Sequence, residues 1–271
     1  YMEERPMKIG FIGGGNMGSA MALRFIESGA AAADSVIICD TNREKLDVFA
    51  AKGCAVTDKI ADVITDAEIT FLAIKPQAFF SLKEELKDKI RSEVVISILA
   101  GKKIASIKEV IGHIDGAVVR LMPNLACRYG KGVTLADMSE LDNTKKERVE
   151  KLLSALGLLV ETEEKDFNFR SAVSGCGPAF FFEYYKHFFN ECVKSGMNED
   201  IARKMVLQTA GGAAELALNS QETFDKLIAN VCSKGGSTIE GVKVMQKSDL
   251  EKIVSETLAA SKKRNDELEN A

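Results

Sequence analysis

The 271 residues include 36 Lys and Arg against 40 Asp and Glu, so the formal net charge at pH 7 is -4. Apolar residues make up 46% of the chain, charged residues 28%, and only 4 residues are proline, which excludes disordered and collagen-like classes. No basic excess is available to neutralise a phosphate backbone, so nucleic acid is not an expected partner. The length allows one large or two modest domains.

The cysteines and the apolar runs bear on the cellular compartment. Six cysteines are scattered without a Cys-x-x-Cys pair, and the two histidines are His113 and His187. This spacing matches neither a zinc site nor a disulfide scaffold, so no metal is expected. Two acids, Glu3 and Glu4, precede an apolar run that glycines soon break, and no apolar stretch approaches the ~20 residues that span a bilayer. We expect a cytoplasmic protein with reduced thiols and no membrane contact.

From the N-terminus, apolar β-rich runs alternate with amphipathic stretches. The first run, 8–12, enters a glycine turn that is followed by apolar residues at helical spacing. Such alternation is typical of a parallel sheet with helices on both faces, so we predict an α/β first domain over residues 7–165. Further strands are expected at 36–39, 69–74, 94–99 and 117–121, and helices at 43–52, 79–91 and 103–112.

After residue 165 the β-branched runs disappear, which predicts an all-helical second domain over 166–271. One helix should begin at Gly177-Pro178, because proline suits the first turn of a helix. Aromatic side chains between 180 and 189 cover most of the circumference of this helix, so they need burial on more than one side. We expect a partner subunit to supply that cover, in a homodimer formed through the C-terminal helices. A capping box at Ser237 to Glu240 indicates a later helix start.

Gly13, Gly15 and Gly18 form a Gly-x-Gly-x-x-Gly motif between the first strand and the first helix. The first glycine permits a tight turn, the second lets a pyrophosphate approach the backbone, and the third lets the helix pack on the strand. The helix N-terminus then faces the phosphates. A flexible turn without a ligand is the alternative interpretation, but the strand, the helix and a downstream acid, Asp40, favour dinucleotide binding.

Asp40 ends the second expected strand. A carboxylate there would accept hydrogen bonds from the adenosine ribose and repel a 2′-phosphate, which favours NADH over NADPH. Arg43 and Asn42 are close enough in sequence to fold over the ribose and reverse that preference. Both NADPH and NADH therefore stay open as cofactors, and a solvated acid at a strand end is the alternative interpretation of Asp40.

Three loops follow later strands, and two glycine turns lie in the second half. Ligands of α/β sheets bind outside the carboxyl ends of the strands, so the three loops together should line a cofactor cleft, although each alone is also typical of an ordinary turn. The two glycine turns suit a small carboxylate, because their backbone N–H groups bind anions. Cys176 lacks a sequence-near histidine and is interpreted as a packed side chain. The loops are Lys75-Pro76-Gln77, Ala100-Gly101 and Met122-Pro123-Asn124, and the turns are Ser174 to Pro178 and Ser233 to Thr238.

These segments resemble pyrroline-5-carboxylate reductase over nearly the whole chain. The most specific segment is Asn230 to Gly241, where Lys234 replaces the usual proline and Ser237 a usual threonine. Phe224 and Leu125-Ala126 also depart from the family pattern, and these departures concern substrate detail rather than reaction class. The other segments that carry the likeness are Ile9 to Gly18, Lys75-Pro76-Gln77, Arg120 to Asn124 and Ser174 to Ala179.

The resemblance implies a Rossmann domain, a helical dimerisation domain with active sites at the subunit interface, and in some members higher assembly of dimers. It implies an oxidoreductase of proline biosynthesis that reduces 1-pyrroline-5-carboxylate to L-proline with NADPH or NADH. The implied cofactor-binding residues are Gly13, Gly15, Asn16, Met17, Gly18, Asp40, Arg43, Ala73, Lys75, Pro76, Ala100, Asn124 and Asn230. The implied substrate-binding residues are Ser174, Ser233, Gly235, Gly236, Ser237 and Thr238.

Hydride transfer to a protonated imine depends on positioning and desolvation more than on a strong acid or base. We hypothesise that the N–H groups of Gly235, Gly236 and Ser237 hold the substrate carboxylate. The Thr238 hydroxyl would then meet the ring nitrogen as the catalytic group.

Two other functions stay open. Lys186 and Asn190 have the Lys-x-x-x-Asn spacing of a β-hydroxyacid dehydrogenase or imine reductase, in which a lysine exchanges a proton with a hydroxyl. The second possibility is that the protein binds a nucleotide without catalysing a reaction, because fold does not fix function. It would then be a catalytically inactive homologue.

Overall fold

The computed structural model describes residues 7–270, which form two compact units. Residues 7–176 together with 261–270 make up the sheet unit, and residues 177–260 make up the helical unit. The chain returns to the sheet unit with the last turns of helix α13 (Leu250–Glu269). Helix α8 (Phe167–Ser174) also belongs to the sheet unit, and the domain boundary expected after residue 165 stays a prediction.

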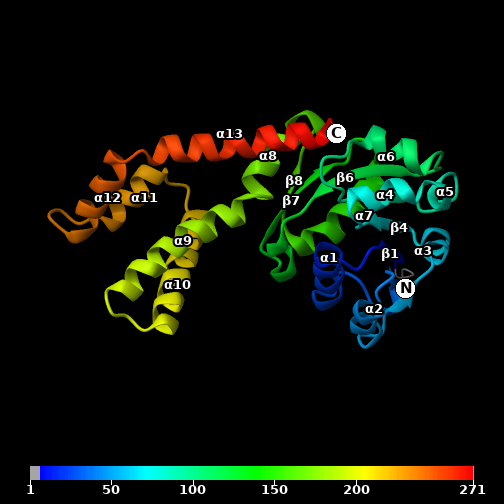
Figure 1. Cartoon of the computed structure of the whole chain (residues 1–271), viewed down its shortest axis with the longest axis horizontal. Helices are drawn as coiled ribbons and strands as arrows, with labels where there is room; N and C mark the ends of the chain where they lie inside the picture. Colours follow the sequence, from blue (N-terminus) through cyan, green and yellow to red (C-terminus); the bar gives the residue numbers. More distant parts are fainter. Residues whose placement is uncertain (1–6, 271) are drawn as a thin grey trace. The chain divides into compact units, whose positions relative to one another are not determined.

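Among the described residues, eight strands form one sheet in the order β3-β2-β1-β4-β5-β6-β7-β8 (Figure 1). Neighbouring strands run parallel except β6 and β7, which confirms the predicted mainly parallel α/β sheet. The strand order reverses at β1, so ligands are expected outside its carboxyl end. The strands are β1 (Ile9–Ile12), β2 (Val36–Cys39), β3 (Ala55–Thr57), β4 (Ile69–Leu72), β5 (Val94–Ser97), β6 (Ala117–Met122), β7 (Gly132–Asp137) and β8 (Gly157–Glu161).

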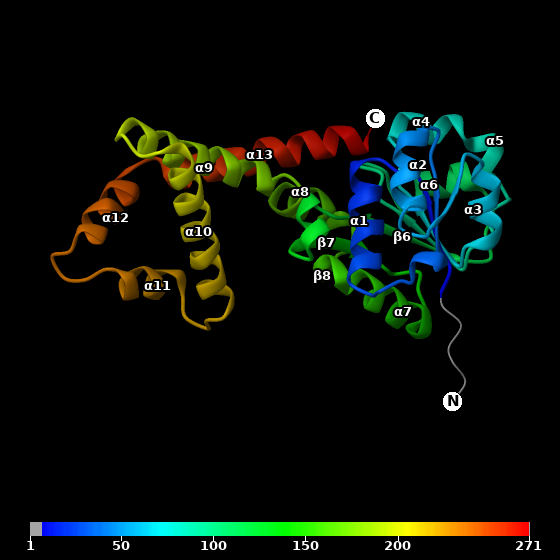
Figure 2. The same ribbon diagram turned by 90° about the horizontal axis from the view of Figure 1, so that it is seen from below.

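Each face of the sheet buries its own apolar cluster. On one face, α1, α2 and α7 cover Phe11 and Phe71, whose rings stack with centroids 4.5 Å apart. On the other face, α3, α4, α5 and α6 cover Leu72 and Val95. Helices on both faces are what a parallel sheet of apolar strands requires, and Figure 2 shows them from a second direction. The helices are α1 (Asn16–Glu27), α2 (Arg43–Ala50), α3 (Ile60–Asp66), α4 (Pro76–Ser81), α5 (Lys83–Leu86), α6 (Ile104–Ile111) and α7 (Asn143–Leu153).

The single helix predicted over 79–91 is wrong. Pro76 occupies the first turn of α4, so this helix begins earlier than the apolar spacing indicates. The backbone leaves the helical region at Leu82, where ψ is 6°, and α5 follows as a separate short helix. Asp88 then has φ 59°, which prevents further continuation. The sequence pattern also fails to predict β3, β7 and β8, because none of these strands contains a run of more than three apolar residues.

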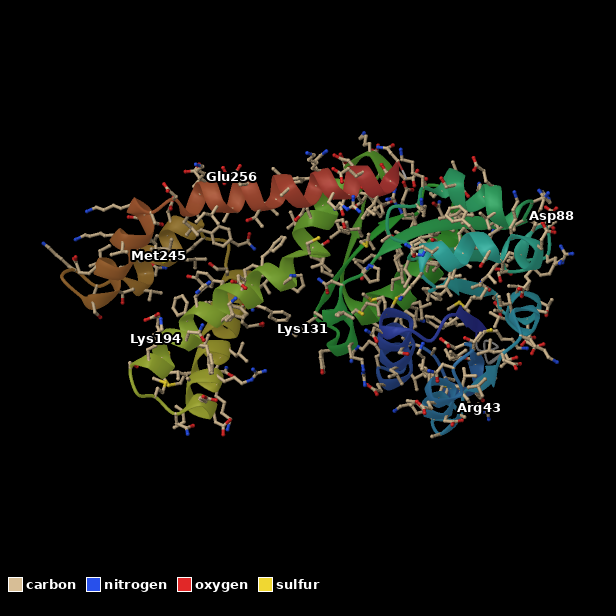
Figure 3. All side chains as sticks on the ribbon, in the orientation of Figure 1. Arg43, Asp88, Lys131, Lys194, Met245 and Glu256 are labelled. Carbon is tan, nitrogen blue, oxygen red and sulfur yellow. The ribbon has the colours of Figure 1, made fainter. Side chains whose placement is uncertain are left out.

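The helical unit contains α9 (Gly177–Lys194), α10 (Glu199–Leu218), α11 (Phe224–Val231), α12 (Ser237–Lys247) and most of α13, as predicted. Ala202 is its only buried apolar residue within the part of the chain that the structure describes. Phe182 of α9 is 67% exposed, and Met245 of α12, labelled in Figure 3, is 40% exposed. Over residues 7–270, no helix combines the length and apolar character needed to cross a membrane.

Candidate active site

The first glycine turn joins β1 to α1 and can be built only with small residues. Gly13 has φ +108°, and a Cβ there would overlap the backbone of Ala73, which follows β4. The Gly13 N–H donates to the carbonyl oxygen of Cys39 at 2.8 Å, so the turn is tied to β2. A Cβ on Gly18 would overlap the carbonyl oxygen of Gly13, so α1 packs directly on the turn. Two of the three motif glycines are therefore required by the fold itself.

The fold of this chain does not itself require a glycine at Gly15. A Cβ on Gly15 would meet no atom within 4 Å among the described residues. Gly15 is the N-cap of α1 and no side chain caps the helix there. The first N–H groups of a helix, here those of Asn16 and Met17, have no acceptor in their own helix. Open space in front of a helix N-terminus fits the pyrophosphate of a dinucleotide.

Asp40 follows β2 beside this turn, and its side chain is 11% exposed. Its Oδ2 accepts hydrogen bonds from the Gly14 N–H at 2.8 Å and the Lys45 Nζ at 3.3 Å, and its Oδ1 accepts one from the Asn42 N–H at 2.8 Å. Burial raises the pKa of Asp40, but these hydrogen bonds outweigh burial and set the net pKa below the ordinary value of 3.8. Asp40 therefore carries a negative charge at neutral pH.

A cavity of about 310 Å³ lies beside Asp40. Arg43, labelled in Figure 3, lines it and pairs through Nε with Asp47 Oδ1 at 3.1 Å. Lys45 is a second cation near Asp40 that the sequence analysis missed, although the charged stretch after β2 contains it. The cavity lining thus combines two cations, Arg43 and Lys59, with three carboxylates, and Lys45 lies nearby on Asp40. The other lining residues are Thr41, Leu46, Val56, Thr57, Asp58, Lys59 and Asp62.

The predicted loops after β4, β5 and β6 share one edge of the sheet with the glycine turn, because these strands are parallel to β1. The Ala73 N–H donates to the Ile12 carbonyl at 2.8 Å, so the end of β4 lies directly beside the turn. Lys75 is the N-cap of α4 and Pro76 its first residue. Ala100 follows β5 and is exposed. The structure therefore brings these predicted cofactor residues to the carboxyl edge.

A hydrogen bond between Asn124 and Ser174 connects the loop after β6 to the end of α8. Asn124 is buried; its Nδ2 donates to the Ser174 carbonyl at 2.9 Å, and its Oδ1 accepts from the Ala126 N–H at 3.1 Å. The Ser174 hydroxyl donates to the Arg170 carbonyl at 3.1 Å. These contacts make Asn124 a structural link between the loop after β6 and the segment that leads into the helical unit.

The second glycine turn lies in the helical unit and leads into α12. Gly235 has φ +73°, and the Gly236 N–H donates to the Ser233 carbonyl at 3.0 Å. The predicted capping box is wrong, because Gly236 is the N-cap and Ser237 already lies inside the helix without a side-chain cap. Thr238 is the exposed second residue of α12.

Two further predicted positions also lie in the helical unit. Asn230, at the end of α11, donates from Nδ2 to Glu222 Oε2 at 2.6 Å. The Lys186 Nζ of α9 lies 2.6 Å from both carboxylate oxygens of Glu183. Lys186 is therefore an ion-paired surface lysine of α9, and no contact in the described chain joins it to Asn190.

Comparisons with known proteins identify relatives of both parts of the chain. A family model described as "Pyrroline-5-carboxylate reductase dimerisation" matches residues 164–268, and one described as "NADP oxidoreductase coenzyme F420-dependent" matches residues 8–101. The chain is 32% identical to pyrroline-5-carboxylate reductase of Aquifex aeolicus, over 93% of this chain and 94% of that protein. It is 31% identical to pyrroline-5-carboxylate reductase 3 of Danio rerio, over 97% of this chain and 92% of that protein.

A solved structure is similar over the same range. Plasmodium falciparum pyrroline carboxylate reductase, with NADP bound, has a TM-score of 0.86 and 25% identity, and the match covers 97% of this chain and 98% of that one. These full-length relatives do not favour the dehydrogenase alternative built on Lys186. The chain, with its dinucleotide-type glycine turn and its helical second unit, belongs to the pyrroline-5-carboxylate reductase family.

Proposed function

We propose that this protein reduces the cyclic imine 1-pyrroline-5-carboxylate to L-proline, the last step of proline biosynthesis, with NADPH or NADH as the reductant. The observation that carries the proposal is the open N-terminus of α1 at Gly15, in a chain with this family membership. The bound reduced nicotinamide supplies a hydride. The electron pair of the C=N π bond stays on nitrogen when the imine carbon accepts the hydride, so an iminium substrate becomes an amine without a strong protein acid.

For the cofactor, we propose that the N–H groups at the start of α1 hold the pyrophosphate and that Asp40 faces the adenosine ribose. The Oδ2 of Asp40 already accepts two hydrogen bonds from the protein, but its Oδ1 accepts only the one from the Asn42 N–H and can still accept from a ribose hydroxyl. Its negative charge opposes a 2′-phosphate, whereas Arg43 and Lys45 attract one. NADH is the proposed preferred cofactor, and both reductants are used. The remaining proposed cofactor-binding residues are Gly13, Asn16, Met17, Gly18, Ala73, Lys75, Pro76, Ala100, Asn124 and Asn230.

For the substrate, we propose that the start of α12 binds the carboxylate. Gly236 leaves this helix N-terminus without a side-chain cap, so the N–H groups of Ser237 and its neighbours suit an anion. The Thr238 hydroxyl sits on the first turn of α12, within the same short segment as these N–H groups, and is proposed to contact the ring nitrogen. Ser174, Ser233 and Gly235 complete the proposed substrate-binding set.

The family model for residues 164–268 supports homo-oligomerisation, and we propose that the C-terminal helices form the dimer. Support comes from the exposed aromatic side chains of α9 and from Gly211 and Gly212 of α10. A Cβ on either glycine would meet nothing within 4 Å in the described chain, so a second helix can approach there. Higher assembly of dimers and a cytoplasmic location remain predictions.

The testing experiment is a turnover assay of the purified protein with 1-pyrroline-5-carboxylate and either NADH or NADPH, followed at the reduced nicotinamide absorbance. We expect turnover with both and a higher kcat/KM with NADH. Thr238→Ala should lower kcat by about 100-fold while NADH affinity stays unchanged. NADH binding without imine reduction would instead support the inactive homologue, and unchanged turnover in Thr238→Ala would reject the role of that hydroxyl.

A further inference from the structure

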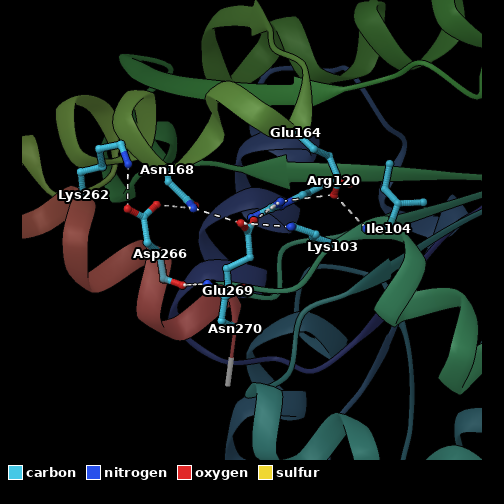
Figure 4. Close-up of polar contacts among 9 residues, drawn as sticks. All are labelled: Lys103, Ile104, Arg120, Glu164, Asn168, Lys262, Asp266, Glu269 and Asn270. Atoms are coloured by element: carbon cyan, nitrogen blue, oxygen red, sulfur yellow. Dashed lines mark hydrogen bonds and ion pairs between the residues drawn. The ribbon is translucent and has the colours of Figure 1, made fainter.

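A buried cation lies in the otherwise apolar strand β6. The Arg120 side chain is 3% exposed, and its guanidinium carbon lies 4.5 Å from the ring centroid of Phe167. A buried charge is costly unless paired acceptors replace its water. Two carboxylates do so through Nη1: Glu269 Oε1 at 2.9 Å and Glu164 Oε1 at 3.2 Å (Figure 4). Arg120 therefore connects the sheet to the last turn of α13.

Glu269 contacts more than Arg120. Its side chain is 10% exposed, and its Oε2 accepts from Asn168 Nδ2 at 3.1 Å and lies 3.5 Å from Lys103 Nζ. One turn earlier, Asp266 accepts from the same amide at 2.8 Å. The final turns of α13 are thus fastened to α8, to β6 and to the segment that leads into α6.

This network holds the loop between β5 and α6 at two positions and the first residue of α6 at a third. Gly101 is buried with φ +68°, and a Cβ there would lie 2.9 Å from the carbonyl carbon and oxygen of Leu268. Lys103 pairs with Glu269, and the Ile104 N–H donates to Glu164 Oε1 at 2.8 Å. The only contact that joins a side chain of α13 to a charge on this loop, among the described residues, is the one between Glu269 and Lys103.

The place of this loop follows from the strand order. β2 with Asp40 lies on one side of β1, and β4 and β5 lie on the other. A dinucleotide whose pyrophosphate lies at β1 and whose adenosine lies at β2 extends its other half over β4 and β5. Ala100, directly before Gly101, is therefore on the nicotinamide side.

We propose that Glu269 is a positioning residue, which acts through Lys103, Arg120 and the Leu268 backbone to set the conformation of the β5–α6 loop against the nicotinamide half of the cofactor. This inference rests on the proposed function, because it uses Ala100 as part of the cofactor cleft. The anchors of the adenosine half, Gly15 and Asp40, lie outside the network. Loss of the Glu269 carboxylate should then misplace the reacting end of the cofactor and leave the affinity for the other half intact.

The test compares Glu269→Gln in the full chain with the wild type. We expect kcat to fall by about tenfold, because small misplacements of reacting groups are costly in rate, while KM for NADH stays within about twofold. The affinity for ADP-ribose, which lacks the nicotinamide, should be unchanged. Glu267→Gln is the matched control, because Glu267 lies in the same turn and pairs only with Arg264 of its own helix. It should behave as the wild type.

A second variant keeps the test informative if Glu269→Gln folds poorly. Lys103→Met removes the loop side of the same contact and should lower kcat with the same KM pattern, and the double variant should be no slower than the slower single one. An unchanged kcat in both single variants, or a loss equal to the loss of folded protein, overturns the positioning role. Absence of imine reduction by the wild type would count against the proposed function instead.

Discussion

The sheet unit and the helical unit differ in how much of their apolar side chains they bury. The sheet unit buries both faces of its sheet under its own helices, including large side chains such as Phe11, Phe25 and Phe71. The helical unit carries equally large side chains, among them Phe181, Phe182 and Phe188, and leaves them more than half exposed in the single chain. An exposed patch of this kind is the mark of an interaction surface.

The difference shows which unit can bury its apolar residues without a partner chain. The first unit has local βα connections and two apolar clusters of its own, so its central strands are covered by nearby segments of the same chain. The second unit leaves large apolar side chains uncovered in the single chain, and residues 164–268 match a dimerisation model, which supports homo-oligomerisation. Substrate binding and assembly are therefore expected to depend on each other. Cofactor binding is expected to depend mainly on the first unit, since Asn230 is the one proposed cofactor-binding residue in the second.

The largest expected effect is on the sheet unit, at Gly13. Gly13→Ala should destabilise the fold by about 2 kcal/mol or more and abolish NADH binding, because the φ of +108° and the Ala73 backbone both exclude a Cβ. Gly15→Ala is the matched control for the fold and should change the free energy of unfolding by less than ~0.5 kcal/mol. It should still weaken NADH binding by about tenfold, because the added methyl occupies the space proposed for the pyrophosphate. Denaturant unfolding and NADH titration measure both, and equal unfolding curves for the two variants would contradict the distinction.

The next effect tests the dependence of the helical unit on a partner. Phe182→Asp places a charge in the exposed aromatic surface and should weaken self-association by about 30-fold, or ~2 kcal/mol, with loss of turnover at low protein concentration. Light scattering coupled to size exclusion reports the assembly. Val48→Asp, at an exposed apolar position of the sheet unit, should leave the assembly intact. If the assembly of the Phe182→Asp protein has the same molar mass in solution as that of the wild type, the helical unit does not depend on a partner through this surface.

A smaller effect concerns the pH dependence of the sheet unit. The pKa of Asp40 is lowered in the folded state, so its contribution to stability is present above the ordinary pKa of 3.8 and is lost as the pH falls through the lowered value. At pH 7 the wild type should melt roughly 2 °C or more above Asp40→Asn, and the gap should close below pH 3.8. Asp47→Asn, which removes only an exposed ion pair with Arg43, should give a smaller gap at every pH. A gap for Asp40→Asn that does not narrow as the pH falls below 3.8 would show that the carboxylate charge is not the cause.

The smallest effect distinguishes the thiols buried in the core of the sheet unit from the partly exposed thiols of the chain. Burial raises the pKa of Cys39 and of Cys127 in the sheet unit to about 11, from 9.0. Their thiolate fraction at pH 8 is therefore about 100-fold lower than that of an ordinary cysteine. Cys176, Cys192 and Cys232 are partly exposed, so iodoacetamide should label these three before Cys39 and Cys127, as followed by mass spectrometry. Early labelling of Cys127 in the native protein would count against a tightly packed sheet unit.

The sequence predicts most of the sheet unit because its signals are local. The strand from Ile9, the glycine turn and Asp40 follow each other within one βαβ stretch, where apolar runs and glycine spacing carry the information. The prediction fails at 79–91, because Pro76 and Leu82 set helix ends that apolar spacing does not reveal. It also assigns a capping role to Ser237 that Gly236 fills, since a box pattern does not specify which residue leaves the helical backbone.

The sequence by itself determined the fold class, the dinucleotide-type turn and an acid at the end of β2, because turn geometry and the alternation of strands and helices depend on residues close in the sequence. Only the tertiary structure decided what Arg120 does within an apolar strand, since Glu164 and Glu269 lie 44 and 149 residues away along the chain. The same holds for Asn124, whose amide is engaged by Ser174, 50 residues away. Partners that lie far apart along the chain leave no periodic pattern in the sequence. They become apparent only in the folded structure, where a buried polar group must be hydrogen-bonded to offset its loss of water.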